Sequence, residues 1–418
     1  HRMSSDTIDL TRLLIMLSDA LELASPGIAM HQTKTAFIAF RIAERLGFAP
    51  AHRRELVWAA LLHDVGALSP EEKIELHSGN PRHIERHCRN GRVVLSRVPL
   101  MERVAEVVGR HHDAWTGGGA PDETALDASI IHLADVVEIE IDRSGYILFQ
   151  MEELRRRVRE QRGGEYAPDA ADAFHEISTT EEFWLELASP RLPTRMAMEQ
   201  HLMDHRCPMN ELVGVSRLAR DIIDFRSTFT ATHSSGVAAV ASAIGALLGF
   251  SREECLSLEI AGNLHDIGKM AVSNAILLKP GPLDATERAI MRQHPWHTAV
   301  VLARAGLPVE TVEAAGWHHE RLDGSGYPRR AKAADTGLHA RVMGVADVFT
   351  ALAEERPYRG AMRGEEVRRI LDSMAHRGAL EPLVVGLIQD NFEAVVEAMR
   401  AAQTAAAAFY HAVVPDAA

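Results

Sequence analysis

The chain has 418 residues, of which 46% are apolar and 25% charged, values of an ordinary globular protein that exclude a disordered or fibrous chain. A formal net charge of −13 repels polyanions, so we expect no nucleic-acid polymer as a partner. The longest apolar stretch, 237–250, is too short to cross a bilayer, so we expect no membrane partner. The three cysteines form no CxxC pair and indicate no disulfide framework, which favours a location in the reducing cytoplasm.

The spacing of apolar residues predicts helices from the first part of the chain onward. Phe37, Phe40, Ala43 and Leu46 recur at three-residue steps, and segment 237–247 uses steps of three and four. Segments in which apolar and polar residues alternate with the two-residue period of half-buried strands are rare. We therefore predict an all-α fold built from helical bundles.

A long internal repeat divides the chain. Segment 31–66 matches 233–268 without a gap, at an offset of 202 residues (233 minus 31), and segment 87–112 matches 294–319 at an offset of 207 (294 minus 87). Such self-similarity predicts a tandem duplication. We place the first copy at 6–190, the second at 205–400 and a C-terminal helix or tail at 401–418. Two prolines near 190, which interrupt a helix, mark the linker.

The repeat retains an ordered set of histidines and aspartates. In the second copy these are His233, His265, Asp266, His294, His318, His319 and Asp347. Their equivalents in the first copy are His31, His63, Asp64, His87, His111, His112 and Asp135. Imidazoles and carboxylates bind first-row transition metals, and five imidazoles with two carboxylates exceed what one ion takes. The set predicts two divalent transition-metal ions per intact site. The alternative for a single histidine is a surface or core residue.

Neighbouring residues on a helix point about 100° apart, so His265 and Asp266 can face different ions. Asp266, with two oxygens, is the expected bridging ligand, and His318 and His319 are expected to be divided between the ions in the same way. Two ions roughly 3.5 to 4 Å apart can share a hydroxide and clamp the attacking and leaving oxygens of a phosphoryl group. We therefore predict phosphoester hydrolysis by a metal-bridging hydroxide, without a covalent enzyme intermediate.

The second copy resembles the HD-GYP family over residues 208–400. The motifs that carry the resemblance are HDIGK at 265–269, KPG at 279–281, HP at 294–295, HHE at 318–320, DGSGYP at 323–328, ADVF at 346–349 and RPYR at 356–359. The resemblance identifies the chain as two tandem HD-type domains. It implies a phosphodiesterase that opens cyclic di-GMP to linear pGpG and on to GMP. The alternatives are cyclic GMP-AMP or another nucleotide as substrate, a non-catalytic cyclic-dinucleotide receptor, and a metal or redox sensor.

The resemblance also implies roles for single residues. Asp266 and Lys269 would be catalytic, and the substrate would be bound by Lys269, Tyr327, Arg356 and Arg359. For the arginines the alternative is a solvated helix end. Iron or manganese are the expected metals, with zinc, nickel or magnesium left open, and a homodimer or a signalling partner protein is also left open.

Some positions depart from the family pattern. Three-metal members place a Glu where this chain has Phe229 and Gly27, so we expect two metals, and Thr350 replaces the second acid of the DVFDAL motif. The first copy keeps its ligands but has other residues where the second has phosphate-binding groups: Ala67, Ala120, Ser144 and Ile147. We expect a metal-bound regulatory or structural partner for the second copy. The rival is a hydrolase for a smaller ester, held by Arg110, Lys73 or Arg92.

Overall fold

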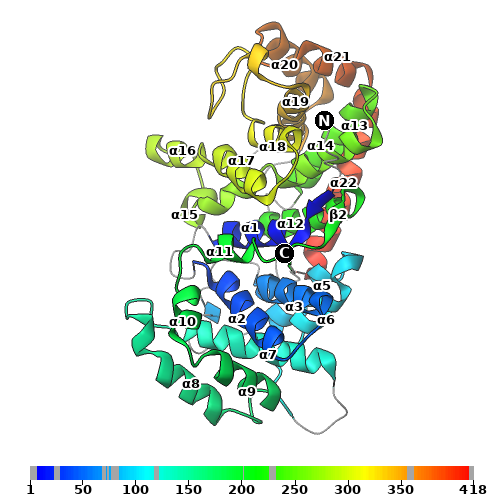
Figure 1. Cartoon of the computed structure of the whole chain (residues 1–418). Coiled ribbons are helices and arrows are strands. Elements are labelled where there is room, and N and C mark those ends of the chain that lie inside the picture. The colour runs from blue at the N-terminus through cyan, green and yellow to red at the C-terminus, as the bar shows by residue number, and fades with distance from the viewer. Residues whose placement is uncertain are drawn as a thin grey trace. The chain divides into compact units, whose positions relative to one another are not determined.

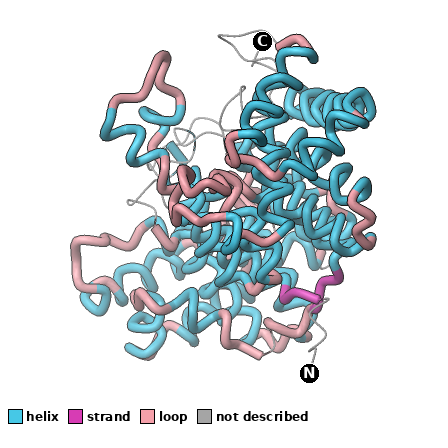
Figure 2. The backbone as a smooth tube through the Cα atoms, turned by 90° about the horizontal axis from the view of Figure 1, so that it is seen from above, coloured by secondary structure: helices cyan, strands magenta, loops and turns pink. Residues whose placement is uncertain are grey.

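The computed structural model describes residues 7–22, 29–67, 72, 75–76, 84–116, 122–200, 202–225, 232–354 and 362–413. Within them the chain is almost entirely helical (Figures 1 and 2), which confirms the predicted all-α fold. The described strands, β1 (Thr7–Asp9) and β2 (Arg206–Pro208), pair in a two-stranded sheet. The chain forms two compact units, Asp9–Arg206 and Cys207–Ala418, the latter together with His1–Ile8.

The first unit is a bundle centred on α2. Its helices are α1 (Leu10–Glu22), α2 (His31–Arg45), α3 (Pro50–Leu62), α5 (Ile84–Leu95), η2 (Pro99–Met101), α6 (Glu102–Val108), α7 (Glu123–Ile139), η3 (Ile147–Phe149), α8 (Met151–Glu160), α9 (Pro168–Ile177), α10 (Glu181–Leu187) and α11 (Leu192–Met196). Helix α2 packs against α3 and α7. Of the apolar residues spaced along it, Phe37, Phe40 and Ala43 are buried, and Leu46 is half-buried at the helix end. The predicted stripe is therefore the core-facing side of α2.

The second unit is a bundle centred on α13. Its helices are α12 (Met209–Asp224), α13 (His233–Leu247), α14 (Arg252–Leu264), η4 (Ile267–Ala271), α15 (Asn274–Leu277), α16 (Ala285–Met291), α17 (His294–Ala305), α18 (Val309–Gly316), η5 (Ala333–Asp335), α19 (Leu338–Ala353), α20 (Gly364–His376), α21 (Pro382–Asp390) and α22 (Phe392–Val413). Helix α13 packs against α14, α19 and α22 and buries Val237, Val240 and Ile244. Ser251 and Glu254 form a capping box that stabilises the start of α14, the helix whose C-cap residue is His265.

The segment between the repeats continues the first bundle. Helix α11 follows Pro190, buries Leu192 and Met196, and packs against α2. At the other end, α22 runs without interruption through residue 401, where the sequence suggests a separate C-terminal segment. The boundaries drawn from sequence stay predictions.

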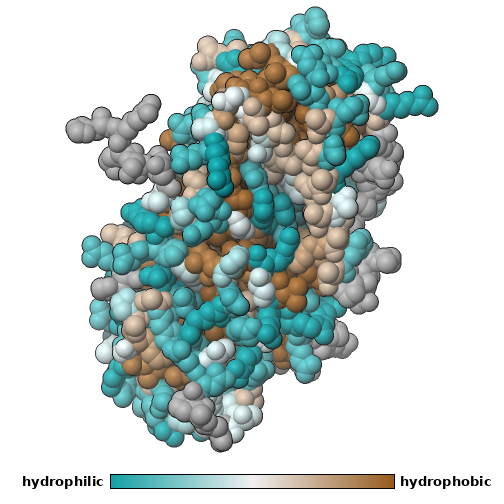
Figure 3. Space-filling view, turned by 90° about the vertical axis from the view of Figure 1, so that its right-hand side faces the viewer, coloured by the Kyte–Doolittle hydropathy of each residue, from teal (hydrophilic) through white to brown (hydrophobic). Residues whose placement is uncertain are grey.

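The surface carries both polar and apolar side chains. Figure 3 shows hydrophilic residues with apolar patches between them on one face, the usual mixture for a globular chain. Among the described helices, none has the combination of length and apolarity needed to span a bilayer.

Candidate metal centres

The predicted ligands of the second copy meet in one place, and all except Asp347 lie at or near helix ends. His233 is the first residue of α13, His294 is the first residue of α17, and His265 caps the end of α14. Asp266 follows His265, His318 and His319 come shortly after α18, and Asp347 projects from α19. All except the half-buried His319 are buried. The structure therefore gathers all seven residues.

Asp266 and Asp347 each present their two oxygens to different histidines. Asp266 places Oδ2 3.3 Å from His265 Nε2 and Oδ1 3.4 Å from His294 Nε2. Asp347 places Oδ1 3.4 Å from His233 Nε2 and Oδ2 3.5 Å from His319 Nδ1. A carboxylate divided in this way has the geometry of a bridging ligand. This arrangement supports the predicted bridging role of Asp266 and suggests a similar one for Asp347.

His265, His294 and His318 direct their Nε2 atoms inward because their Nδ1 atoms donate elsewhere, whereas His319 faces Asp347 with Nδ1. Nδ1 of His265 donates to the Gly262 carbonyl at 2.7 Å, and Nδ1 of His318 donates to that of Ala315 at 2.6 Å. His294 Nδ1 donates to Met291 O at 2.8 Å, and its Nε2 lies 3.2 Å from His318 Nε2. Such outer hydrogen bonds fix the tautomer and leave the inner lone pair for a metal.

Burial and neighbouring charges act differently on the individual histidines. Although burial opposes it, Glu354 and Asp347 raise the pKa of His233 to about 10 and Asp266 raises that of His265, so a cation would displace protons there, whereas burial favours the neutral form of the others. Burial, with Lys269 and His319 nearby, lowers the pKa of His294 to about 3, and burial lowers the pKa of His319 to about 4. Although burial opposes ionisation of Asp266, His265 and Lys269 hold the pKa of its carboxyl well below the ordinary value. Neutral imidazoles beside ionised carboxylates are the donor forms of a metal site.

A glycine brings the His265–Asp266 turn close to α17. A Cβ at Gly268 would lie 1.9 Å from the carbonyl oxygen of His294, so no other residue fits without displacing the backbone. Thr298 links the same elements, since its hydroxyl donates to His265 O at 2.7 Å and accepts from Gly268 N at 3.0 Å. The sequence did not single out Thr298. Its equivalent in the first copy is Gly91, so comparison of the two copies does not mark this position as conserved between them.

Two predicted substrate-binding residues border this centre. Lys269 Nζ lies 2.5 Å from Asp266 Oδ2, and the Tyr327 ring lies 4.8 Å from the His319 ring between centroids. Arg292, which the sequence did not single out, stacks its guanidinium 4.4 Å from the Tyr327 ring centre. Arg356 and Arg359 lie outside the described residues, as do Phe229 and Gly27.

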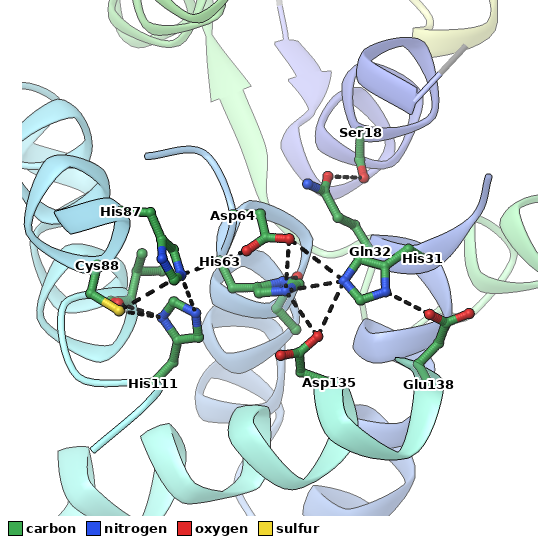
Figure 4. A network of polar contacts seen from close by, with 12 residues as sticks. Ser18, His31, Gln32, His63, Asp64, His87, Cys88, His111, Asp135 and Glu138 are labelled. Atoms are coloured by element: carbon green, nitrogen blue, oxygen red, sulfur yellow. Dashed lines mark hydrogen bonds and ion pairs between the residues drawn. The ribbon is translucent and has the colours of Figure 1, made fainter. Parts of the chain in front are cut away.

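The first copy gathers its equivalent residues in the same way (Figure 4). His31 Nε2 lies 3.3 Å from His63 Nε2 and 3.2 Å from Asp135 Oδ1. Asp64 turns Oδ2 to His63 Nε2 at 3.4 Å and Oδ1 to His87 Nε2 at 3.7 Å, again dividing its oxygens. His112 completes the set, with its ring 4.3 Å from that of His111 between centroids. Both donor sets fit transition-metal ions, which prefer imidazole and carboxylate ligands.

Comparison with known proteins assigns the family. A family model described as the HD domain matches residues 28–140, and a second with the same description matches residues 217–383. The chain belongs to the HD-domain family. One match lies within each copy of the repeat, which confirms the predicted tandem HD organisation.

Relatives of these HD domains fall into two groups. The chain is 27% identical to "3'3'-cGAMP-specific phosphodiesterase 1" of Vibrio cholerae, over 92% of each chain. It is 34% identical to "Cyclic di-GMP phosphodiesterase" of Thermotoga maritima, over 39% of this chain and 45% of that one. A crystal structure of a V. cholerae phosphodiesterase specific for cyclic GMP-AMP aligns with a TM-score of 0.61 at 24% identity, covering 93% of this chain and 98% of the other, and shows the fold.

In the described part of the first HD domain, uncharged residues occupy three positions that carry a cation in the sequence of the second. Ala67, at the position of Lys269, is buried, Ser144 hydrogen-bonds to Asp142, and Ile147 is buried. Two cations suggested for a smaller ester form ion pairs, Arg110 with Asp122 and Arg92 with Glu106, both at 2.6 Å. Ala120 and Lys73 lie outside the described residues. Because both ion pairs are solvent-exposed and therefore weak, the alternative of a hydrolase for a smaller ester stays a hypothesis.

Proposed function

We propose that the second HD domain hydrolyses a cyclic dinucleotide and that 3′3′-cyclic GMP-AMP is its substrate. The observation that carries this proposal is Asp266, whose two oxygens face different histidines while Lys269 lies beside it. The resemblance of the second copy to the HD-GYP family favours cyclic di-GMP as the substrate. We prefer the alternative, because a relative aligned over 92% of each chain is named for cyclic GMP-AMP.

Cyclic di-GMP is the second candidate substrate. A relative named for cyclic di-GMP is more similar, at 34% identity, but it aligns over only 39% of this chain. Both dinucleotides present the same two phosphodiesters, so the metal centre cannot choose between them. The choice depends on groups that meet the purines, such as Tyr327 with Arg292 stacked on it.

Different residues of the second domain would have different roles in the reaction. The seven donors of the second domain would hold two divalent ions, iron or manganese, which supply Lewis acidity and an activated water at a phosphoryl group. Water adds to phosphorus, the bond to the 3′ oxygen breaks, and a proton passes to that oxygen, which gives a linear dinucleotide. Although burial opposes its charge, Asp266 raises the pKa of Lys269, so the ammonium stays charged and can bind a phosphate oxygen.

The first HD domain would bind metal without turning over the dinucleotide. Its donors converge like those of the second domain, but a buried Ala67 stands at the position of Lys269. A dianionic substrate needs local cations to offset its charge. We therefore assign this domain a regulatory or structural role toward the second.

The test is to incubate the full chain, reconstituted with Mn²⁺ or Fe²⁺, with a panel of cyclic dinucleotides and to separate the products by chromatography. We expect the linear dinucleotide from cyclic GMP-AMP, with slower conversion of cyclic di-GMP. Faster conversion of cyclic di-GMP would reverse the substrate order. Binding of a nucleotide that stays intact after long incubation would instead establish a receptor.

A further inference from the structure

A thiol belongs to the histidine cluster of the first HD domain. Cys88, on α5, is only 6% exposed, and its Sγ lies 3.7 Å from His87 Nε2 and 3.7 Å from His111 Nδ1. The Nε2 atoms of His87 and His111 are 3.2 Å apart. Figure 4 shows the thiol pointing toward both rings. Each of the three side chains offers a donor atom, and these atoms lie within 4.8 Å of one another.

The second HD domain has a different third donor at the same place. The offset of 207 residues pairs His87 with His294 and His111 with His318, but it pairs Cys88 with Pro295, which offers no ligand. There the compact group is His294, His318 and His319, all imidazoles. In the first domain the corresponding group contains Cys88 instead of His112. The two domains therefore present chemically different donor sets.

The separations of His87 Nε2 from the other two donors are close to those of a tetrahedral site. With metal–nitrogen bonds of about 2.0 Å and a metal–sulfur bond of about 2.3 Å, tetrahedral angles place donors about 3.3 to 3.6 Å apart. The observed separations of 3.2 Å between nitrogens and 3.7 Å from sulfur to His87 Nε2 bracket this range. His111 uses Nδ1 to donate to the Val108 carbonyl at 2.7 Å, so its Nε2 is the donor to a metal. Asp64 Oδ1 also lies 3.7 Å from His87 Nε2, but it is outside the compact group of three donors.

We propose that His87, Cys88 and His111 form a zinc-type site in the first HD domain, distinct in metal preference from the second domain. Two imidazoles and a thiolate suit zinc, whereas thiolate is a poor ligand for manganese or magnesium. The proposal does not depend on the activity of the second domain.

Binding would require the thiol to give up its proton. Burial and the nearby Asp64 raise the pKa of Cys88 to about 12, so the thiol is protonated until a cation competes for the sulfur. A coordinating thiol is deprotonated outright. Each ion bound through Cys88 therefore releases one proton from sulfur.

The alternative role for Cys88 is a small apolar residue of the core, a common fate of buried cysteine. Cobalt distinguishes the two, because a thiolate bound to Co²⁺ gives an intense charge-transfer absorption that imidazole and carboxylate do not. The full chain, stripped of metal, is titrated with Co²⁺ and its near-ultraviolet absorption is recorded. We expect the band in the wild-type chain and its loss in Cys88→Ser.

The other two cysteines provide matched controls. Cys207 is buried and Cys255 is half-buried, and neither belongs to a compact donor group of the described residues. Cys207→Ser and Cys255→Ser should keep the band. A band that survives Cys88→Ser, or cobalt bound at full occupancy without any band in the wild-type chain, would overturn the proposal.

A second measurement needs no variant, so it holds even if Cys88→Ser fails to fold. X-ray absorption at the zinc edge of the zinc-loaded wild-type chain should show sulfur at about 2.3 Å, together with nitrogen and oxygen at about 2.0 Å. A first shell made only of nitrogen and oxygen would contradict the assignment.

Discussion

His233 donates a hydrogen bond from Nδ1 to the carboxylate of Glu354, at 3.0 Å, and so turns its Nε2 toward Asp347. In the first HD domain His31 donates in the same way to Glu138, at 2.6 Å. The offset of 212 residues that pairs Asp135 with Asp347 pairs Glu138 with Thr350, not with Glu354. The two domains therefore support the same histidine with carboxylates one helical turn apart. Glu354 takes over the contact that Thr350 cannot make.

Removing the charge of Glu354 should weaken metal binding in the second domain. Burial lowers the pKa of His233, but Glu354 and Asp347 together raise it to about 10, which shows how strongly the carboxylates act on this ring. We expect Glu354→Gln to lower the metal affinity of the second domain about 10- to 100-fold, the usual cost of losing such a partner. Competition with a chelating dye measures it. The matched variant Glu138→Gln should weaken only the first domain, and equal effects of both variants on one domain would refute this account.

Gly268 should tolerate no side chain. A Cβ there would lie 1.9 Å from His294 O, and neither backbone can retreat, because Thr298 links the two segments. We expect Gly268→Ala to destabilise the second unit by more than about 3 kcal/mol, the upper range for overpacking. Thermal and urea unfolding measure it. Gly386→Ala is the control, because a Cβ there meets nothing within 4 Å, and a helical Ala should gain about 0.5 to 1 kcal/mol. Similar stabilities of the two variants would show that the close approach is unimportant.

Lys269 should affect turnover more than metal content. It lies 2.5 Å from Asp266 and is the group whose place Ala67 takes in the first domain. We expect Lys269→Ala to reduce kcat/KM for the cyclic dinucleotide about 10²- to 10³-fold, the range for losing one group that stabilises developing charge. Steady-state kinetics with metal analysis on the same samples measure it. Arg217→Ala, which breaks an exposed ion pair with Glu259, should leave kcat/KM unchanged. Loss of metal in parallel with activity would make Lys269 a support for Asp266 instead of a substrate ligand.

Substitution of Asp266 and of its first-copy equivalent Asp64 should distinguish the roles of the two domains. Asp266→Asn replaces one of the two carboxylate oxygens, which face His265 and His294 separately, by an amide nitrogen. We expect less than about 1% of wild-type turnover, because both ions would depend on this carboxylate. Asp64→Asn should lower the metal content of the first domain but retain most turnover. Product chromatography and metal analysis of both variants measure this. Turnover that disappears with Asp64→Asn and persists with Asp266→Asn would move the active site to the first domain.

The sequence was sufficient for the fold class and for the composition of the candidate centres. Apolar spacing in segments 31–46 and 237–247 predicted helices whose stripes are buried, because that spacing depends only on the geometry of one helix. The offsets of the repeat selected fourteen histidines and aspartates, seven in each copy, and the structure gathers each seven into one cluster. Arg356 and Arg359, outside the described residues, stay predictions.

The remaining features were decided by packing between helices. Thr350 interrupts the family motif, and only the approach of α19 to α13 shows that Glu354 reaches His233 instead. The sequence gives no reason to single out Cys88 next to His87. Its contact with His111 arises because α5 packs against the turn after α6. Residue spacing along a chain fixes which side chains share a face of one helix. Which side chains of different helices meet depends on how the helices pack, and that was settled only in three dimensions.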